Sequence, residues 1–501
     1  MEPHSRIVSA PVDFGVVRSE FGLASDYPSD AVSEARGASD AFAGVRADRT
    51  DIEFVTIDPP GALDLDQALY LERTPTGFLL YYAIADVGAV VSPDGALARE
   101  SLTRGQSFYL PDGTVPLHPP VLSEGSASLL PGRVRPAALW TIECDDSAEP
   151  QRFSVQRALV CSRARLEYSG VQADADSGRL HPSIAALPEF GRLRIEAGLA
   201  RGAIELRLPA QSVVPDGNGD RTGHWQLVVE PRTEADDWNE QISLLTGLCA
   251  ARIMLADNGS DGRIGLLRTM PAPPASAIAA MHRTAAALGV HWPAGMPAGR
   301  MLSGLDPATP AALALMSEAT GLLRGASYTV LDGEDPDILQ HSGIGAPYAH
   351  VTAPLRRLAD RYTLEICLAR SAGTPVPQWV RSGLAAAAES MRRSDAVGGK
   401  LDRACLDLTE STILAPRLGE IFEAVVIREG NGNRAAEIFI SDPPVVAKCT
   451  GSPPEGHRVR VRLDIADPDR RVVGFGYPID PARPEMLGNQ QNPGKFPTAG
   501  E

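Results

Sequence analysis

The sequence predicts a mixed α+β protein that ends in a small β-barrel. Over residues 48–410, short β-branched runs alternate with longer segments that repeat apolar residues at helical spacing. Over residues 417–478 the pattern changes to short β-branched runs separated by Gly, Pro and Asn, which is typical of an all-β unit. The chain has 501 residues, which is enough for a large core and more than one domain.

The first two regions can be assigned element by element. Residues 1–47 mix Ser, Ala and Asp and predict one short helix near Asp30–Arg36. Phe54–Ile57 predicts a buried strand, because it is apolar and β-branched and Asp58-Pro-Pro-Gly61 ends it. Helical periodicity in the second region predicts four helices, at Trp238–Asp257, Ala275–Leu288, Pro307–Leu323 and Pro354–Ala369.

The third region predicts a barrel, and a tail follows it. Its strands are expected at Ile421–Ile427, Glu437–Ile440 and Val459–Ile465. Four aromatic residues of this region could either stack on bases or fill the barrel core, namely Phe422, Phe439, Phe475 and Tyr477. Residues 479–501 are rich in Pro, Asn, Gln and Gly and predict a disordered tail.

Composition indicates an ordinary cytoplasmic protein. No apolar run approaches membrane-spanning length, and residues 1–6 lack the apolar core of a signal peptide. The cysteines form no CxxC pair or other zinc-type spacing, so reduced and mostly buried thiols are expected. They are Cys144, Cys161, Cys249, Cys367, Cys405 and Cys449.

Three carboxylates gather at the end of the first predicted strand. Asp58 ends that strand, and Asp64 and Asp66 are one residue apart, so in an extended segment their side chains point the same way. Like charges held together need protons or cations, and hard oxygen ligands suit Mg²⁺ or Mn²⁺. From this spacing alone, a solvated acidic turn or a weak Ca²⁺ loop is the more frequent outcome.

Other segments give this cluster a context. Thr56-Ile-Asp58-x5-Asp64-x-Asp66 resembles the signature of the catalytic domain shared by the ribonuclease II and ribonuclease R exoribonucleases. Further blocks resemble that domain in family order, at Ile84–Val87, Arg104–Pro111, Val115–Leu117, Leu122–Ser123, Arg201–Glu205, Val229–Pro231, His341–Gly345 and Tyr348–Asp360. The resemblance covers residues 20–400 and implies a mixed catalytic domain with a central RNA channel. It also implies that residues 417–478 form an S1-type barrel of the oligonucleotide-binding fold.

The resemblance implies a 3′→5′ exoribonuclease that hydrolyses single-stranded RNA to nucleoside 5′-monophosphates. A divalent ion held by Asp58, Asp64 and Asp66 would make hydroxide from water and neutralise phosphate oxygens. Asp66 is expected to be catalytic. Arg356 aligns with the family residue that stabilises the pentacovalent phosphate.

Three further residues are expected along the RNA path. Tyr109 falls where the family places an aromatic side chain that stacks on terminal nucleotides. Glu240 aligns with an acidic family segment and could accept sugar hydroxyls, although an exposed glutamate near a helix start explains it equally well. His350 lies within the channel motifs, where we expect it to contact RNA without a catalytic role.

The net charge of −16 is unusual for a protein that binds RNA phosphates. A few cations focused in a narrow channel would resolve this conflict, because the outer surface then matters less. Arg356, Arg357 and Arg361 could supply that focus, since on a helix Arg357 and Arg361 share a face. A solvated basic face is the alternative.

Two departures from the family pattern keep a second function open. Gln67 stands where the family usually has a fourth aspartate; its amide can ligate a hard cation but carries no charge. The family also carries cold-shock-type barrels before its catalytic domain, and residues 1–47 leave no room for them. The alternative is therefore an RNA-binding protein with an impaired site. In either case we expect single-stranded RNA as the partner, without a nucleotide cofactor or a membrane.

Overall fold

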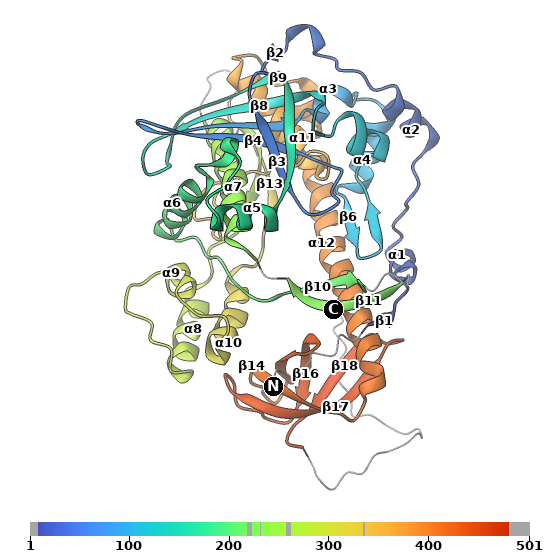
Figure 1. The fold of residues 1–501 in the computed structure, drawn as a ribbon, viewed down its shortest axis with the longest axis vertical. Helices are drawn as coiled ribbons and strands as arrows, with labels where there is room; N and C mark the ends of the chain where they lie inside the picture. Colours follow the sequence, from blue (N-terminus) through green and yellow to red (C-terminus); the bar gives the residue numbers. More distant parts are fainter. Residues whose placement is uncertain (1–8, 218–222, 231, 257–261, 334–335, 480–501) are drawn as a thin grey trace.

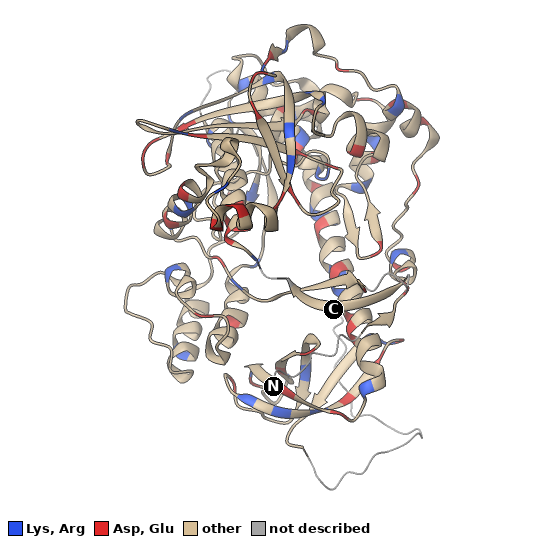
Figure 2. Cartoon of the chain, viewed as in Figure 1, with Lys and Arg blue, Asp and Glu red and all other residues tan. Residues whose placement is uncertain are grey.

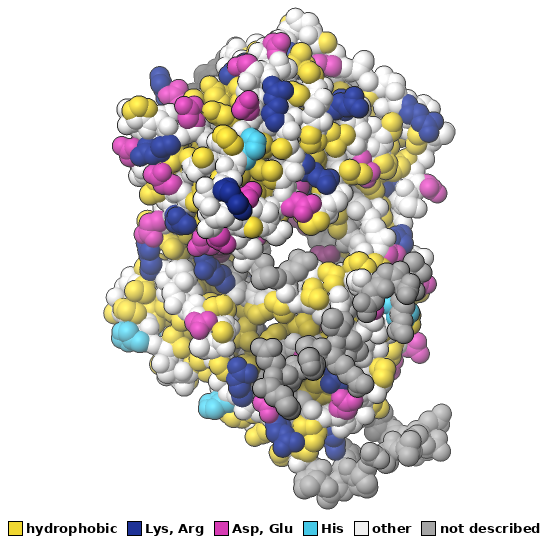
Figure 3. Space-filling model, viewed as in Figure 1, with side chains coloured by type: hydrophobic (Ala, Val, Ile, Leu, Met, Phe, Trp, Pro, Cys, Tyr) yellow, Lys and Arg dark blue, Asp and Glu magenta, His cyan; other side chains and the backbone are white. Residues whose placement is uncertain are grey.

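The computed structural model describes residues 9–217, 223–230, 232–256, 262–333 and 336–479. The elements from β1 to α12, called the body below, are followed by a small barrel (Figure 1). The long helix α12 (Gln378–Leu414) runs from the body to the barrel. Figure 3 shows that this face of the molecule is hollowed near its centre.

A curled six-stranded sheet forms the centre of the body. Its order is β2-β9-β3-β4-β5-β8, and β9 also pairs with β8. The strands are β2 (Ala47–Asp48), β3 (Phe54–Asp58), β4 (Gln67–Thr74), β5 (Gly77–Ala85), β8 (Val134–Cys144) and β9 (Pro150–Glu167). The predicted strand at Phe54–Ile57 is therefore confirmed as β3, and four of its five residues are buried, as expected for an apolar β-branched run.

Three smaller sheets flank the central one. One has the order β1-β11-β10, and the other two are the pairs β6–β7 and β12–β13. Their strands are β1 (Ala10–Pro11), β6 (Phe108–Leu110), β7 (Gly113–Val115), β10 (Ala210–Pro215), β11 (His224–Glu230), β12 (Ile264–Thr269) and β13 (Ser327–Asp332). The β6–β7 pair is a hairpin, and it places Tyr109 beside the acidic loop described below.

Helices cover the sheet and build the main core. Apolar side chains of α7 and α11 pack with those of β4, β5 and β8 into one cluster that includes Trp140 and Trp238. The remaining helices extend the body or carry its connections. The helices before α12 are α1 (Gly15–Glu20), α2 (Ser29–Arg36), α3 (Val87–Val90), α4 (Ala96–Arg104), α5 (Tyr168–Asp176), α6 (Leu187–Ala200), α7 (Glu234–Leu255), α8 (Ala275–Ala287), α9 (Ala298–Ser303), α10 (Pro310–Ala319) and α11 (Leu358–Ser371).

The predicted helices all form, and the limits differ most at α7, α10 and α11; α10 spans Pro310–Ala319 instead of Pro307–Leu323. α7 begins at Glu234 rather than at Trp238, because Thr233 and Asp236 form a capping box; Asp257 lies outside the described residues. α11 begins at Leu358, not at Pro354. The backbone N–H groups of Ala353 and Leu355 donate to side-chain carboxylates, and the segment before Leu358 is not helical.

The barrel confirms the predicted all-β unit. It is closed in the order β14-β15-β16-β18-β17. The strands are β14 (Ile421–Arg428), β15 (Ala436–Ser441), β16 (Pro444–Thr450), β17 (Arg458–Asp467) and β18 (Val472–Gly476). Phe422 and Phe475 are buried and meet edge to face at 5.6 Å, so these two aromatics are core residues.

Some general expectations can also be compared with the structure. All six cysteines are free and buried, as predicted. No helix in the described part of the chain combines the length and apolar character needed to cross a bilayer. Acidic and basic residues are interspersed along the elements (Figure 2). The predicted tail at 479–501 lies almost wholly outside the described residues.

Candidate active site

The three predicted carboxylates lie where two adjacent strands approach each other. β3 and β4 are antiparallel neighbours, so the end of β3 at Asp58 comes close to the start of β4 at Gln67. The loop between them carries Asp64 and Asp66. Asp66 is buried, with 3% of its surface exposed, while Asp58 and Asp64 are partly exposed.

Burial raises the pKa of two of these carboxylates, those of Asp66 and Asp58. Burial raises the pKa of Asp66 to about 8, against the opposing effect of the Arg356 guanidinium. Burial also raises the pKa of Asp58 to about 6, and the negative charge of Asp64 adds to that effect. Asp58 Oδ2 and Asp66 Oδ2 are buried without a hydrogen-bond partner. Such oxygens fit a divalent cation, which would satisfy both of them.

The carboxylates are not closed tightly around one point. Within the described ranges, the group of three acidic side chains whose ligand atoms all lie within 4.8 Å is Glu205, Asp237 and Glu240 instead. Arg232 forms ion pairs with Asp237 and with Glu240, which compensates that second group. Asp58, Asp64 and Asp66 would therefore have to move closer together to bind one ion. The second group is already paired with the guanidinium of Arg232.

Arg356 faces the acidic loop from a separate segment. The segment Thr352–Arg357 follows an irregular path before α11, and Arg356 Nε lies 3.4 Å from Asp66 Oδ2. Nearly half of the Arg356 side chain remains exposed. A cation and a carboxylate are thus adjacent, and the cation is accessible to a ligand.

The expected cluster of three arginines does not form. Arg357 precedes α11 and donates to both carboxylate oxygens of Asp360, at 3.0 and 2.8 Å. Arg361 is 2% exposed, donates to the carbonyl of Val91 and stacks on Trp379. The prediction was wrong for Arg361, because α11 is buried on nearly all sides and this residue faces the core.

Tyr109 lies at the edge of the acidic loop. It sits on the β6–β7 hairpin, and 49% of its surface is exposed. Its hydroxyl donates to Asp64 Oδ2 at 3.0 Å. Burial of the hydroxyl end and the charge of Asp64 raise the pKa of Tyr109, so the group stays protonated and its ring faces outward.

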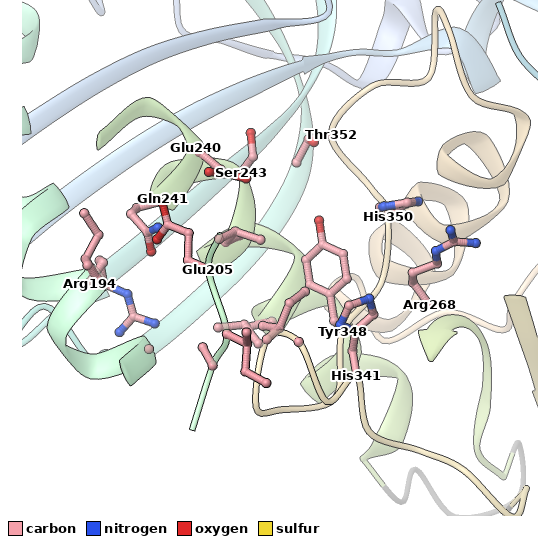
Figure 4. Close-up of a pocket in the computed structure, with 18 of the residues that line it drawn as sticks. Arg194, Glu205, Glu240, Gln241, Ser243, Arg268, His341, Tyr348, His350 and Thr352 are labelled. Carbon is pink, nitrogen blue, oxygen red and sulfur yellow. The ribbon is translucent and has the colours of Figure 1, made fainter. Parts of the chain in front are cut away.

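A cavity of about 740 Å³ lies beside this loop. Gln67 and Arg356 are among the residues that line it. Figure 4 shows side chains from two of its walls. Glu240, Gln241 and Ser243 come from α7, and His341, Tyr348 and His350 come from the segment opposite. Its volume is in the range of ordinary ligand pockets.

The other two predicted RNA contacts occupy this cavity in different ways. Glu240 is exposed and paired with Arg232. His350 shares a 2.7 Å hydrogen bond with the hydroxyl of Tyr328, and burial with nearby arginines keeps its pKa well below the usual value. His350 is therefore a neutral wall residue in this arrangement.

Several cavity residues had no individual assignment from the sequence. They are Tyr168, Arg194, Arg201, Glu205, Arg232 and Arg268. Arg201 and Glu205 belong to one of the family-like blocks, which signals importance but not position. Arg194 and Arg268 carry no local pattern, because only the fold brings α6 and β12 to the same cavity.

Comparisons with known families give two matches. The RNB domain model matches residues 46–368. The model of the RNase II-type exonuclease C-terminal S1 domain matches residues 420–477. The two matches agree with the division into a body and a closed five-stranded barrel.

Curated relatives are named ribonuclease R. The protein from Acidithiobacillus ferrooxidans is 34% identical over 198 residues, which are 37% of this chain and 45% of the relative. The protein from Vibrio parahaemolyticus is 27% identical over 363 residues, 68% of this chain and 41% of the relative. The protein from Escherichia coli is 29% identical over 326 residues, 63% and 39%. The chain thus spans less than half the length of each of these relatives.

Solved structures show the same fold. Mycoplasma genitalium RNase R in complex with ribose-methylated single-stranded RNA has a TM-score of 0.81 at 18% identity, and the match covers 92% of this chain and 77% of that one. Yeast Ssd1, a pseudonuclease, has a TM-score of 0.62 at 15% identity, with 86% and 52% covered. The fold is therefore found both in an RNA complex and in a protein described as a pseudonuclease.

Proposed function

The chain belongs to the RNB-domain exoribonucleases of the ribonuclease II and ribonuclease R family, and we propose that it hydrolyses single-stranded RNA from the 3′ end. The products are nucleoside 5′-monophosphates, and the metal is Mg²⁺ or Mn²⁺. Residues 48–410 carry out cleavage, and the barrel at 417–478 adds RNA contacts. The observation that carries this proposal is the approach of Arg356 to Asp66, at 3.4 Å from Nε to Oδ2.

The charges of this pair suit phosphodiester hydrolysis. Asp58, Asp64 and Asp66 would hold the divalent ion, with the Gln67 amide as a neutral fourth ligand. When bound, such an ion supplies a hydroxide near neutral pH and offsets charge on the phosphate. Arg356 is accessible and close to the same point, so its guanidinium would stabilise the negative charge that develops on the phosphate oxygens.

The cavity walls, together with the β6–β7 hairpin beside the acidic loop, suit the 3′ end of a single RNA strand. Tyr109 presents an exposed ring for base stacking, which accepts any base. Glu240 lies on the α7 wall, where a carboxylate can accept sugar hydroxyls once it is released from Arg232. Arg357 and His350 line the cavity beside Arg356 and complete the wall that faces the strand.

Digestion of a 5′-labelled single-stranded RNA tests the proposal. With Mg²⁺ or Mn²⁺, we expect a ladder that shortens from the 3′ end and disappears with EDTA. Asp66→Asn should abolish the ladder while keeping the acceptor for the Leu355 N–H group. Asp51→Asn is the matched control, because the Asp51 side chain is 72% exposed and its ion pair is with Arg49, outside the cluster.

A second function remains, and one residue favours it. Gln67 removes one formal charge from the set that the family uses, so the chain could bind RNA without cutting it efficiently. RNA binding in EDTA together with an uncut substrate in either metal would support this second function and contradict the first.

A further inference from the structure

We propose that Gln67 is a positioning residue that fixes the loop carrying Arg356 against the acidic cluster. Its amide takes a place in the structure that an aspartate cannot take. The inference deepens the proposed function and rests on it, since Arg356 matters here as the group that stabilises charge developing on the phosphate.

The loop in question is held by three side chains. Gln67 Nε2 donates to the carbonyl oxygen of Thr352 at 2.5 Å. The carboxylate of Asp360 accepts from Ala353 N, and that of Asp66 accepts from Leu355 N, both at 2.7 Å. Pro354 lies between them and has no N–H group to bond. The backbone immediately before Arg356 is therefore anchored at 352, 353 and 355.

The following backbone continues this order. Arg356 N and Arg357 N both donate to the carbonyl of Ala353, at 3.2 and 2.9 Å. On the other side, Ser107 N donates to the carbonyl of Arg356 at 2.9 Å. The segment that carries the guanidinium is therefore held from Thr352 to Arg356. The Gln67 bond to Thr352 is at the N-terminal end of this segment.

The Gln67 contact requires a donor. A backbone carbonyl only accepts hydrogen bonds, so the NH₂ group of the amide must be the part that faces Thr352. An aspartate has no donor when ionised, is one methylene shorter, and would face this carbonyl with like partial charge. Thr352 is 3% exposed, so water does not easily replace the lost bond.

Glutamine at position 67 therefore lacks the negative charge of an aspartate but provides the hydrogen bond to Thr352. An aspartate here would add a charged ligand for the metal, but it would release Thr352 and loosen the segment that aims Arg356. Gln67→Asp is consequently expected to reduce turnover rather than restore it. A glutamine at this position is then compatible with a working site.

The test compares Gln67→Met and Gln67→Asp with the native chain. The first variant removes the donor without adding charge, and the second adds charge as well. In metal-free protein, we expect backbone hydrogen exchange over residues 352–357 to rise about tenfold in both. On labelled RNA with Mn²⁺, kcat should fall about tenfold or more. KM and the Kd for RNA in EDTA should stay within about threefold of native values. A general loss of structure would change these values together with kcat.

Gln211→Met is the matched control. Gln211 Nε2 also donates to a backbone carbonyl, that of Pro444 at 2.7 Å, but it joins β10 to the barrel. This variant should leave exchange over 352–357 and kcat unchanged. Gln67→Ala repeats the test if Gln67→Met does not fold.

Two results would overturn the inference. The first is native-like exchange over 352–357 in Gln67→Met. The second is faster cleavage by Gln67→Asp than by the native chain. If the native chain cuts no RNA, the proposed function fails, and the exchange measurement still decides whether Gln67 holds the loop.

Discussion

Asp66 is the buried carboxylate of the proposed metal site, and it should make the metal-free protein sensitive to pH. Its pKa is about 8 in the folded chain against an ordinary value of 3.8. Between these values the folded chain keeps a proton that the unfolded chain has released. Stability is therefore highest below pH 4 for this group and falls as pH rises to 8. The expected slope is up to about 1.4 kcal/mol per pH unit in the free energy of unfolding.

Asp66→Asn should remove most of this slope. Asp58, with a pKa of about 6, keeps a smaller contribution between pH 4 and pH 6. Urea unfolding of both proteins in EDTA at pH 5, 6, 7 and 8 measures the difference. Parallel dependence of the two proteins on pH would mean that Asp66 ionises at an ordinary pKa.

Arg356 allows a second prediction at this scale. Arg356→Ala should lower kcat by about 10²–10³, the loss typical of removing one group that stabilises developing charge. Arg356→Lys should recover only part of it, because an ammonium cannot form the paired contacts of a guanidinium. The Kd for RNA in EDTA should change little. Arg99→Ala, at an arginine that is 67% exposed, is the control, and an equal fall in both alanine variants would contradict the assignment.

The residues of the site differ in how far the sequence reveals them. Asp58, Asp64 and Asp66 share one short segment, so their spacing is readable along the chain. The partner of Gln67 is 285 residues away, and no periodicity connects the two. Arg361 was misassigned because helical spacing gives a shared face but not the direction of that face. The carbonyl of Val91 and the ring of Trp379 draw it inward.

At the scale of elements, the β6–β7 hairpin makes a separable contribution. Tyr109→Phe removes only the hydrogen bond to Asp64 and keeps the exposed ring. Tyr109→Ala removes the ring, and we expect binding of a short RNA to weaken about tenfold, as one stacked base is worth ~1–3 kcal/mol. Fluorescence anisotropy in EDTA measures both. Equal loss in the two variants would show that the hydroxyl, not the ring, contributes the affinity.

Element limits follow the chemistry of the ends more than the apolar pattern. The capping box Thr233-x-x-Asp236 marks the start of α7 at Glu234. A prediction from the spacing of apolar residues alone does not include these two polar residues. The start of α11 depends on Asp66 and Asp360, which bond the preceding N–H groups from elsewhere in the fold. Strands β16 and β18 were not predicted individually, because β16 starts at Pro444 and β18 contains Gly474 and Gly476, residues that weaken the strand pattern.

At the scale of the whole molecule, the charge of −16 and the cavity must be considered together. Six arginines line the cavity, and each has an acidic partner: Arg194 and Arg201 with Glu149, Arg232 with Asp237 and Glu240, Arg268 with Asp395, Arg356 with Asp66, and Arg357 with Asp360. Asp66 keeps its proton near neutral pH in the metal-free protein, so Arg356 is the exception, and little net positive charge is left to displace counterions from RNA. The attraction between the cavity and the RNA phosphates should thus act over short distances, and RNA affinity should depend only weakly on salt concentration.

This pairing of charges predicts that the affinity for RNA falls only slowly with salt concentration. Neutralising one of the partner carboxylates should make the fall steeper. For the native chain in EDTA, we expect log K for RNA binding to fall with log salt at a slope of about −2 or less in magnitude, since each displaced counterion adds ~0.7 for single strands. Asp395→Asn removes the partner that Arg268 holds at 2.7 Å, so the slope should steepen by ~0.7.

The matched control changes charge by the same amount at another ion pair. Glu389→Gln removes the partner of Arg392, which is not among the residues that line the cavity, and should leave the slope unchanged. Anisotropy titrations between 50 and 400 mM KCl measure all three proteins. A native slope of about −4 or steeper would mean that more phosphates are neutralised than the paired arginines allow. RNA would then be held mainly by cations outside the cavity, in spite of the acidic composition.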